Sequence, residues 1–347
     1  MIYLIDPCND PCGHSVIYRN SLSKIENTKY LDCPVDLKKV KSPIWMIFKY
    51  YMALRKQLGC VPKGNSAHLL YGDLYYKIPF ICSKLLKRNK TLVTMHTFPN
   101  GKLKHFLLKN FCRRVERVIV HSEHIKRGMN AIGINNVTHI DYPSFYNYAE
   151  LPSKNELRFQ LNIPQDKIIF SALGGIRNDK GLDILLEAFR YMSQKIKARI
   201  ILNVAGKPGF LGLHDIEDLC NRYNIHSRLD IRPLTEKEFM ENVIISDYMV
   251  MPYRKNMTGN SGPMTEAIVN KIPCIVPISS NLGAIACQHN IGVCFKQEDP
   301  KDLAATIEKV LQTPHAFDFS YSQKLKESSF IENHKQLYRS LGFLQNR

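Results

Sequence analysis

A glycine turn between two apolar segments constrains the fold of this chain more than any other feature. The turn spans residues 174–181 (GGIRNDKG), and an apolar run at 167–173 (KIIFSAL) precedes it. Apolar residues at helical spacing follow it over 182–189. This order predicts a strand, a turn and a helix, which is the repeating unit of α/β folds with parallel sheets.

The cations of this turn predict an anion site. Arg177 and Lys180 lie where the N–H groups of a helix start are unpaired and the helix dipole is positive. Such a turn suits a phosphate or a diphosphate. The alternative is an ordinary surface loop whose cations are solvated.

A second turn of related composition lies further along the chain. Residues 248–253 (YMVMPY) predict a buried strand, and Arg254 and a polar, glycine-containing loop follow it. Pro263, after Gly262, is expected at the first helical position, because its fixed φ and missing N–H suit a helix start. Glu266 is then expected in the first helical turn, where the dipole favours a carboxylate. The alternative is that Glu266 accepts hydrogen bonds from ribose hydroxyls, and two such turns then predict a nucleotide.

The first half of the chain also predicts a parallel sheet. Because helical stretches separate its apolar runs, the sheet is expected to be covered on both faces. Ligands bind beyond the carboxyl ends of such strands, so His96, His121 and Ser122 are expected to point toward a shared cleft. The alternative is that these side chains satisfy loop backbone groups. The runs expected to be strands are 1–6, 69–71, 91–95 and 118–120.

Three segments carry a resemblance to a known family. They resemble the retaining glycosyltransferases of family 4, strongly over residues 165–312 and weakly in the first half. The resemblance implies the GT-B fold, an α/β fold of two Rossmann-like, doubly wound parallel-sheet domains with a cleft between them and a C-terminal helix that crosses back. The segments are GGIRNDKGLDILLEAF, MPYRKNMTGNSGPMTEAIVNKIPCIVP and NIGVCFKQEDPKDLAATIEKVL.

The resemblance also implies a division into domains. Residues 1–150 are expected to form an acceptor-binding domain and residues 165–320 a nucleotide-sugar-binding domain. Residues 321–347 are expected to form a helix that packs on the N-terminal domain. The prolines between about 143 and 165 fit a linker.

Site residues follow from the same resemblance. It implies that Arg177 and Lys180 bind the donor diphosphate and that His96 faces the donor sugar, and these three are the expected catalytic residues. It implies that Glu266 binds the ribose. The other donor-binding residues that it implies are Gly13, Gly175, Arg254, Thr258, Ser261 and Gly262.

Thr258 departs from the pattern of the family. The family often carries two glutamates separated by seven residues, and Glu266 matches the second, whereas Thr258 stands in place of the first. A variant of the family with a YR…T…SG loop looks similar to this chain. The first glutamate commonly contacts the donor sugar, so the identity of the sugar and the retention of activity stay open.

The charge of the chain is unevenly distributed. The 347 residues fit two domains of about 150–200 residues. Residues 1–150 hold 23 Lys and Arg against 10 Asp and Glu, a net of +13, and the remainder holds 25 against 21, a net of +4. The first half is therefore expected to face an anionic partner such as nucleic acid, an acidic membrane or a phosphorylated acceptor. A basic surface that only keeps the protein soluble is the alternative.

Two basic segments with aromatic residues are candidates for a membrane-facing surface. Residues 44–58 and 102–117 could form amphipathic helices of the kind that lie in a bilayer interface. We expect their apolar faces to cover the sheet, and their cations, not their aromatic side chains, to face the membrane or the acceptor. The expected cations are Lys102, Lys104, Lys109, Arg113 and Arg114.

The chain is expected to work in the cytoplasm, or peripherally at the inner face of the membrane, without a metal ion or other cofactor. Cys8, Cys12 and His14 lie close together, but no second ligand pair accompanies them, so zinc is not expected. The N-terminus reaches Asp6 too early to hold a signal-peptide core. No apolar run approaches the ~18 residues that span a bilayer.

The resemblance implies a reaction and two partners. The chain is expected to move a hexose-type sugar, with retention, from a UDP- or GDP-sugar to a saccharide or lipid-linked acceptor in cell-surface polysaccharide or glycan synthesis. Nucleic acid is not expected as a partner, because no aromatic-basic RNA motif or helix-turn-helix pattern occurs. The alternatives are a GT-B nucleotide-sugar epimerase, a non-catalytic relative, and a basic protein that binds nucleic acid or membranes.

Overall fold

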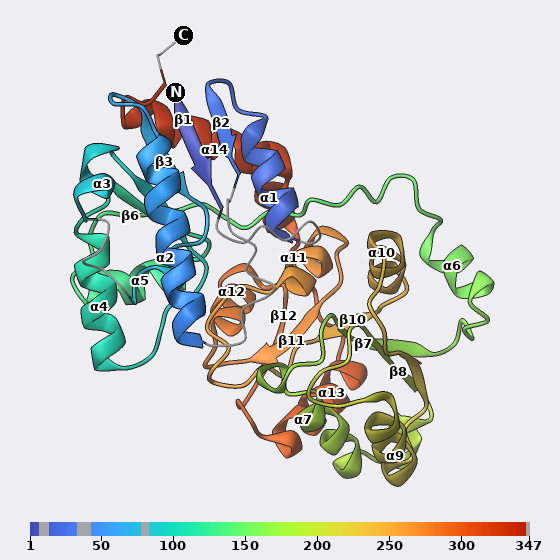
Figure 1. Ribbon diagram of the computed structural model, residues 1–347. Coiled ribbons are helices and arrows are strands. Elements are labelled where there is room, and N and C mark those ends of the chain that lie inside the picture. Colours follow the sequence, from blue (N-terminus) through green and yellow to red (C-terminus); the bar gives the residue numbers. More distant parts are fainter. Residues whose placement is uncertain (7–13, 33–42, 78–82, 345–347) are drawn as a thin grey trace. The chain divides into compact units, whose positions relative to one another are not determined.

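The computed structural model describes residues 1–6, 14–32, 43–77 and 83–344 (Figure 1). The chain forms two compact units, one of Met1–Phe145 with Lys326–Arg347 and one of Tyr146–Leu325. Each unit holds a six-stranded sheet whose paired strands are parallel. Gly13, Cys8 and Cys12 lie outside the described residues.

The sheet of the first unit has the order β2-β1-β3-β4-β5-β6, with its switch point between β1 and β3. The predicted strand at 69–71 is displaced, because β3 ends at Leu69 and the chain then turns at Gly72–Leu74. Asp73 fixes this turn by accepting hydrogen bonds from the N–H groups of His96 (2.9 Å) and Thr97 (2.9 Å). The strands are β1 (Ile2–Ile5), β2 (Thr28–Leu31), β3 (Ser66–Leu69), β4 (Leu92–Met95), β5 (Arg117–Val120) and β6 (Val137–His139).

Helices cover both faces of this sheet because alternate strand residues point to opposite sides. On one face, Leu54 and Leu108 pack in a cluster with Val93. On the other, Tyr18 and Phe330 pack in a second cluster with the remaining strand residues. The helices of the first face are α2 (Pro43–Cys60), α3 (Ser83–Arg88), α4 (Lys102–Cys112) and α5 (Glu123–Ala131), and those of the second are α1 (His14–Ser23) and α14 (Glu327–Ser340).

The C-terminal helix α14 is part of the first unit, although it follows the second unit in the sequence. Its Phe330, Leu337 and Tyr338 are buried in the same cluster as residues of β1 and α1. Glu327, in its first turn, pairs with Lys24 (2.7 Å) and accepts a hydrogen bond from Ser21. The expected C-terminal helix is therefore present, and it packs on the sheet formed by the start of the chain.

The sheet of the second unit has the order β12-β11-β10-β7-β8-β9. This is the Rossmann order of two three-strand halves, and its switch point lies between β7 and β10. The strands are β7 (Ile168–Leu173), β8 (Ile200–Ala205), β9 (Ser227–Asp230), β10 (Tyr248–Val250), β11 (Cys274–Pro277) and β12 (Gly292–Phe295).

Helices again pack on both faces of this second sheet, in three separate apolar clusters. Its α-helices are α6 (Lys154–Gln160), α7 (Leu182–Ala188), α8 (Gln194–Lys197), α9 (Leu213–Tyr223), α10 (Glu236–Ile244), α11 (Gly262–Val269), α12 (Asn281–His289) and α13 (Pro300–Gln312). Its 3₁₀ turns are Asn178–Lys180, Phe189–Tyr191 and Ser320–Leu325.

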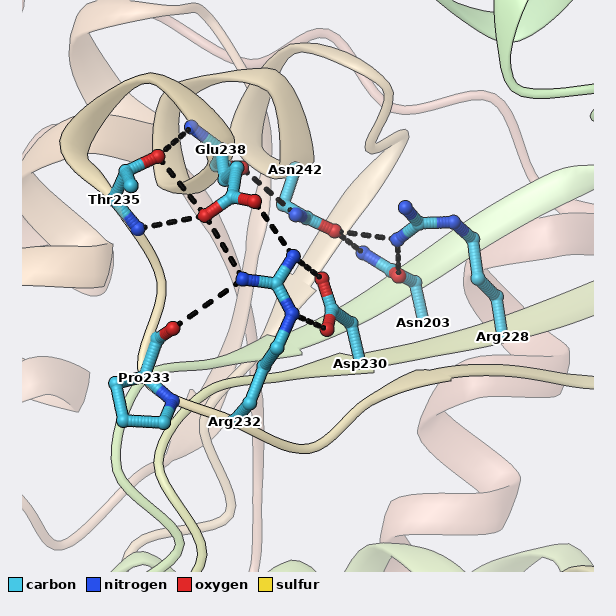
Figure 2. Close-up of polar contacts among 8 residues, drawn as sticks. All are labelled: Asn203, Arg228, Asp230, Arg232, Pro233, Thr235, Glu238 and Asn242. Atoms are coloured by element: carbon cyan, nitrogen blue, oxygen red, sulfur yellow. Dashed lines mark hydrogen bonds and ion pairs between the residues drawn. The ribbon is translucent and has the colours of Figure 1, made fainter.

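The loop after β9 shows how polar contacts fix one corner of this unit (Figure 2). Thr235 and Glu238 form a capping box at the start of α10. Arg232 holds this corner to the strand, because its guanidinium pairs with Glu238 (2.6 Å) and with Asp230 (2.8 Å). These hydrogen bonds, first those from Arg232, lower the pKa of Glu238 to about 2. Arg232 thus connects the carboxyl end of β9, which pairs with β8, to the start of α10.

Both units confirm the predicted fold class of doubly wound parallel sheets covered by helices. In the described part of the chain, no helix has both the length and the apolar character needed to cross a membrane.

Candidate functional site

The two predicted turns follow adjacent strands of the second unit. The turn at 174–181 follows β7, and the loop that begins at Arg254 follows β10. β7 and β10 are paired, with Tyr248 beside Phe170. This pair is the switch point of the sheet, so the two turns diverge there. The space between such turns is where open α/β sheets bind ligands.

The turn after β7 relies on glycine at its close contacts. Gly174 has a φ of 98°, which favours glycine. A Cβ atom on neighbouring Gly206 would lie 2.2 Å from the carbonyl oxygen of Gly174, so the two loops approach closer than side chains allow. Ile176 donates its N–H to the carbonyl of Lys207 (2.8 Å) and fixes the loop after β8 to this turn.

The helix after this turn begins at Leu182, where its apolar spacing predicts it. A 3₁₀ turn over Asn178–Lys180 comes first, and α7 starts at Leu182 after Gly181, whose φ is 62°. A Cβ atom at Gly181 would lie 2.2 Å from the carbonyl oxygen of Pro252. Lys180 therefore sits on a short turn that is pressed against the end of β10.

Lys180 joins the two turns. Its Nζ would lie 2.9 Å from a Cβ atom built on Gly174, and the same Cβ would lie 3.8 Å from Cγ of Pro263 in α11. The ammonium group is also 5.7 Å from the centre of the Tyr253 ring. Among the described residues no carboxylate pairs with Lys180 within 4 Å. The ammonium group thus lies beside Gly174, near the start of α11, and Asp179 interacts with it only at longer range.

Arg177 has a closer partner than the sequence indicates. Its guanidinium donates two hydrogen bonds to Asp179, at 2.9 and 2.7 Å, while 58% of the side chain stays exposed. These hydrogen bonds raise the pKa of Arg177 and lower the pKa of Asp179. The pair carries no net charge, so Lys180 is the dominant positive charge of this turn.

Arg254 supports the turn instead of extending into solvent. Its Nε donates to the carbonyl of Asn178 (2.9 Å), and its guanidinium also pairs with Asp183 at the start of α7. Its backbone N–H donates to the carbonyl of Asp179 (2.9 Å). All three contacts connect the loop after β10 to the turn that holds Lys180.

The start of α11 differs by one residue from the prediction. The helix begins at Gly262, and Pro263 is its second residue, because Ser261 caps the helix by accepting a hydrogen bond from the N–H of Met264 (3.4 Å). Ser261 also shares a hydrogen bond with the hydroxyl of Tyr253 (3.0 Å). Thr258, in the preceding loop, is half-buried, as are Gly175 and Gly262.

Glu266 lies beyond the first turn of α11, so the expected interaction with the helix start is wrong. With Ser261 as the cap, Glu266 is the fifth helical residue. Its side chain is buried (2% exposed), and its Oε2 accepts a hydrogen bond from the hydroxyl of Tyr148 (3.0 Å). Burial and the carboxylate raise the pKa of Tyr148, so this hydroxyl remains a donor. No sequence pattern indicates Tyr148, which lies far from Glu266 along the chain.

His96 follows β4 in the first unit and is half-buried. Its ring stacks on Tyr71 (4.4 Å between centres), and its Nε2 is 2.8 Å from the carbonyl oxygen of Leu70. Burial lowers the pKa of His96 despite the opposing effect of Asp73. His121 and Ser122 are buried, and Ser122 caps α5. For Ser122 the alternative prediction is therefore correct, because its hydroxyl accepts hydrogen bonds from backbone N–H groups at the start of α5.

The five predicted cations around α4 do not share one exposed face. Lys102, Lys104 and Arg113 are exposed. Lys109 and Arg114 are half-buried, because the Lys109 ammonium lies against Gly133 and Arg114 donates to the carbonyl of Asn110. Within the described ranges, no group of three or more His, Cys, Asp or Glu side chains is placed to hold a metal ion.

The sequence of the second unit matches a family model. Residues 153–332 match the family described as glycosyl transferases group 1. The chain belongs to this family. It is a retaining glycosyltransferase that uses a nucleotide-sugar donor. No curated protein matches the sequence.

Solved structures share the fold of this glycosyltransferase over nearly its whole length. Sucrose-phosphate synthase from Thermosynechococcus elongatus is 17% identical, with a TM-score of 0.74 and 98% of each chain covered. HepE of Anabaena in complex with UDP is 12% identical, with a TM-score of 0.70, covering 98% of this chain and 99% of that one. WaaG, a glycosyltransferase of lipopolysaccharide biosynthesis, is 13% identical, with a TM-score of 0.62 and coverage of 99% and 96%. The predicted GT-B fold is confirmed.

Proposed function

We propose that this glycosyltransferase transfers a hexose-type sugar from a UDP- or GDP-sugar to a saccharide or lipid-linked acceptor, in the synthesis of a cell-surface polysaccharide or glycan. The position of Lys180 carries the proposal, because its ammonium group lies beside Gly174 in the first turn and 5.7 Å from the centre of the Tyr253 ring, just before the second. The similar HepE structures contain UDP, and in one case UDP and glucose, which supports a UDP-sugar. The net charge of +13 over residues 1–150 supports an anionic acceptor and work at the inner face of the membrane.

Lys180 is proposed to bind the diphosphate of the donor. When the bond between the anomeric carbon and the phosphate oxygen breaks, negative charge increases on the leaving nucleoside diphosphate. A cation that is already fixed beside the phosphate stabilises that charge at no cost of reorganisation. Arg177 is exposed enough to contribute a second cation, although it must share its hydrogen bonds with Asp179.

The remaining roles are proposed from the same geometry. Glu266, which Tyr148 orients, is proposed to accept hydrogen bonds from the ribose, and the backbone of Ser261 and Gly262 to contact phosphate. Gly175 and Thr258 are proposed to line the donor site. Gly13, from outside the described residues, and His96 are proposed as contributions of the first unit to the donor diphosphate and sugar. Arg254 is proposed to position the turn, given its three contacts there.

Replacing the central cation tests this proposal. Lys180→Ala is expected to lower kcat/KM for the donor by about 10²–10³-fold, the loss typical of one fixed donor to a developing anion. Transfer would be measured with the sugar nucleotide that gives the largest thermal stabilisation in a panel of UDP-, GDP- and ADP-sugars. Lys195→Ala, at an exposed lysine of α8, is the matched control and should leave kcat/KM unchanged.

Two results would contradict the proposal. One is a Lys180→Ala enzyme whose kcat/KM stays within a few-fold of the wild type. The other is a protein that none of the sugar nucleotides stabilises but that binds oligonucleotides in a salt-sensitive way, which would favour a nucleic-acid-binding protein.

A further inference from the structure

Two helices of the first unit combine cations with apolar residues and contain no carboxylate. α2 (PIWMIFKYYMALRKQLGC) carries Lys49, Arg55 and Lys56. α4 (KLKHFLLKNFC) carries three lysines. Neither helix has an Asp or a Glu, so no carboxylate of the same helix offsets the charge of these cations.

The apolar residues at the start of α2 do not cover the sheet, contrary to expectation. Trp45 is 62% exposed, Met46 37%, Ile47 38% and Phe48 50%. Four successive residues point in four directions around a helix, so this end of α2 projects from the unit. The helix becomes buried only from Ala53 and Leu54 onward.

The exposed stripe continues along one side of α2. Trp45, Phe48 and Met52 are spaced at three and four residues, which places them on one helical face. The rings of Trp45 and Phe48 pack edge to face, with their centres 5.8 Å apart. Met52 is 44% exposed. The ring of Phe48 also contacts that of Tyr51, with their centres 6.5 Å apart, while all three side chains of the stripe remain exposed.

α4 adds a second exposed apolar pair. Leu103 is 72% exposed and Phe106 is 61% exposed, whereas Leu108 and Phe111 are buried. Lys102 and Lys104 flank Leu103 and are exposed. α2 and α4 lie on the same face of the sheet, since their buried residues share one cluster (Figure 1). Because crossover helices run antiparallel to the strands, both helices begin at the carboxyl edge of the sheet.

We propose that these residues form a docking surface for an anionic lipid bilayer, with the apolar side chains inserted in the interface and the lysines and arginines paired with lipid headgroups. Aromatic and aliphatic side chains flanked by cations are the composition of helices that lie in this way. The docking surface comprises Trp45, Met46, Ile47, Phe48, Met52, Leu103 and Phe106.

Charge favours a lipid partner over a second copy of the chain. A symmetric dimer through the docking surface would bring the lysines and arginines of α2 and α4 close to the same residues of the other copy. Like charges across an interface are unfavourable, and no carboxylate of either helix compensates them. An anionic bilayer neutralises the cations. It also takes up the projecting apolar side chains without needing a complementary pocket.

Trp45 is the only tryptophan of the chain, so its fluorescence reports on the docking surface directly. Phosphatidylglycerol vesicles are expected to shift its emission to shorter wavelength, and brominated lipid is expected to quench it. Phosphatidylcholine vesicles, or about 0.5 M salt, should reduce binding at least several-fold, because screening weakens attraction to headgroups. An unchanged emission spectrum with phosphatidylglycerol would overturn the proposal.

Substitutions separate the docking surface from the donor site. The double variant W45S/F48S is expected to reduce co-sedimentation with phosphatidylglycerol vesicles at least about tenfold. Phe159→Ser, at a residue of α6 that is 82% exposed, is the matched control and should bind as the wild type does. Circular dichroism verifies that both variants are folded. Vesicle binding by W45S/F48S equal to that of the wild type would refute the assignment, as would a dimer that this variant abolishes without any vesicle binding. Lys180→Ala should bind vesicles as the wild type does, because the docking surface does not include the donor site. The vesicle test therefore stays valid even if the proposed sugar transfer is not observed.

Discussion

Arg254 connects two turns that the sequence separates by many residues. It binds the carbonyl of Asn178 and the carboxylate of Asp183, while its own N–H binds the carbonyl of Asp179. The guanidinium fork is well suited to such simultaneous contacts. Its effect on catalysis would therefore be indirect, through the placement of Lys180.

Replacing Arg254 tests that indirect effect. Arg254→Ala is expected to lower kcat/KM by up to about 10²-fold, because a displacement of about 1 Å at a reacting group has effects of that size. Steady-state kinetics should show most of the loss in kcat, with Arg254→Lys restoring only part of it, since lysine lacks the fork.

Asp183→Asn provides the matched partner. If Arg254 acts through the turn, the double variant should lose little more activity than either single variant. Fully additive losses would show that Arg254 acts elsewhere, for example directly on the donor.

At the scale of single residues, sequence reasoning identified the chemical types better than their contacts. The glycines and Lys180 were predictable, because a close approach and a free cation leave a local pattern. Tyr148 and the pairing of Arg177 with Asp179 were not predicted. The first depends on a tertiary contact with Glu266, and the second on the 3₁₀ conformation of Asn178–Lys180.

The C-terminal helix α14 is the element with the greatest structural consequence. It supplies Phe330, Leu337 and Tyr338 to the apolar cluster of the first unit. The hydroxyl of Tyr338 is 2.7 Å from Nδ1 of His68 in β3, and both side chains are fully buried. A polar contact in such surroundings is costly to leave unmade.

Tyr338→Phe tests this contact. The substitution removes only the hydroxyl and leaves Nδ1 of His68 buried without that partner. The free energy of unfolding of the first unit is expected to fall by about 1–3 kcal/mol, measured by urea denaturation. Tyr191→Phe, at a tyrosine that is 39% exposed, should change it by less than about 0.5 kcal/mol. Equal effects of the two substitutions would contradict the role given to the buried hydroxyl.

Elements were easier to predict than their ends. Apolar runs between helical stretches indicated parallel sheets, because only a strand buried on both faces tolerates such runs. The end of β3 was displaced, since Asp73 makes its contacts in three dimensions, whereas α7 begins at Leu182, where its apolar spacing predicts it. The exposed start of α2 was missed, because a helix pattern does not show how far a helix extends past the sheet it covers.

At the scale of the whole molecule, buried histidines make the first unit sensitive to acid. His68, His121 and His334 are buried, and His96 is half-buried. Burial lowers the pKa of each, and that of His334 to about 4. Near pH 6.5 these histidines therefore bind protons in the unfolded chain but remain neutral in the folded chain.

The free energy of unfolding of the first unit is expected to be at its maximum above about pH 6.5 and to decrease as the pH falls toward 4. For His334 alone the loss reaches about 3 kcal/mol at the lower end, from a pKa of about 6.5 when unfolded and about 4 when folded. Urea denaturation between pH 5 and 6.5 isolates this effect, because carboxylates titrate mostly below that range.

An exposed histidine serves as the control, because it should not contribute to the pH dependence of the free energy of unfolding. His214, whose side chain is 96% exposed, can be replaced by Gln without changing the pH dependence. A free energy of unfolding that does not vary between pH 5 and 6.5 would contradict the neutral state of these four histidines in the folded protein.

The chain enters the first unit twice, at its start and again at Lys326, with the whole second unit between the two passages. Synthesis from the N-terminus therefore releases every strand of the first sheet long before α14, one of the two helices that cover its second face. The second unit, by contrast, is encoded in one uninterrupted stretch, and all of its strands and helices are synthesised before α14. The first unit thus completes its second apolar cluster only with a helix that is made after the whole second unit.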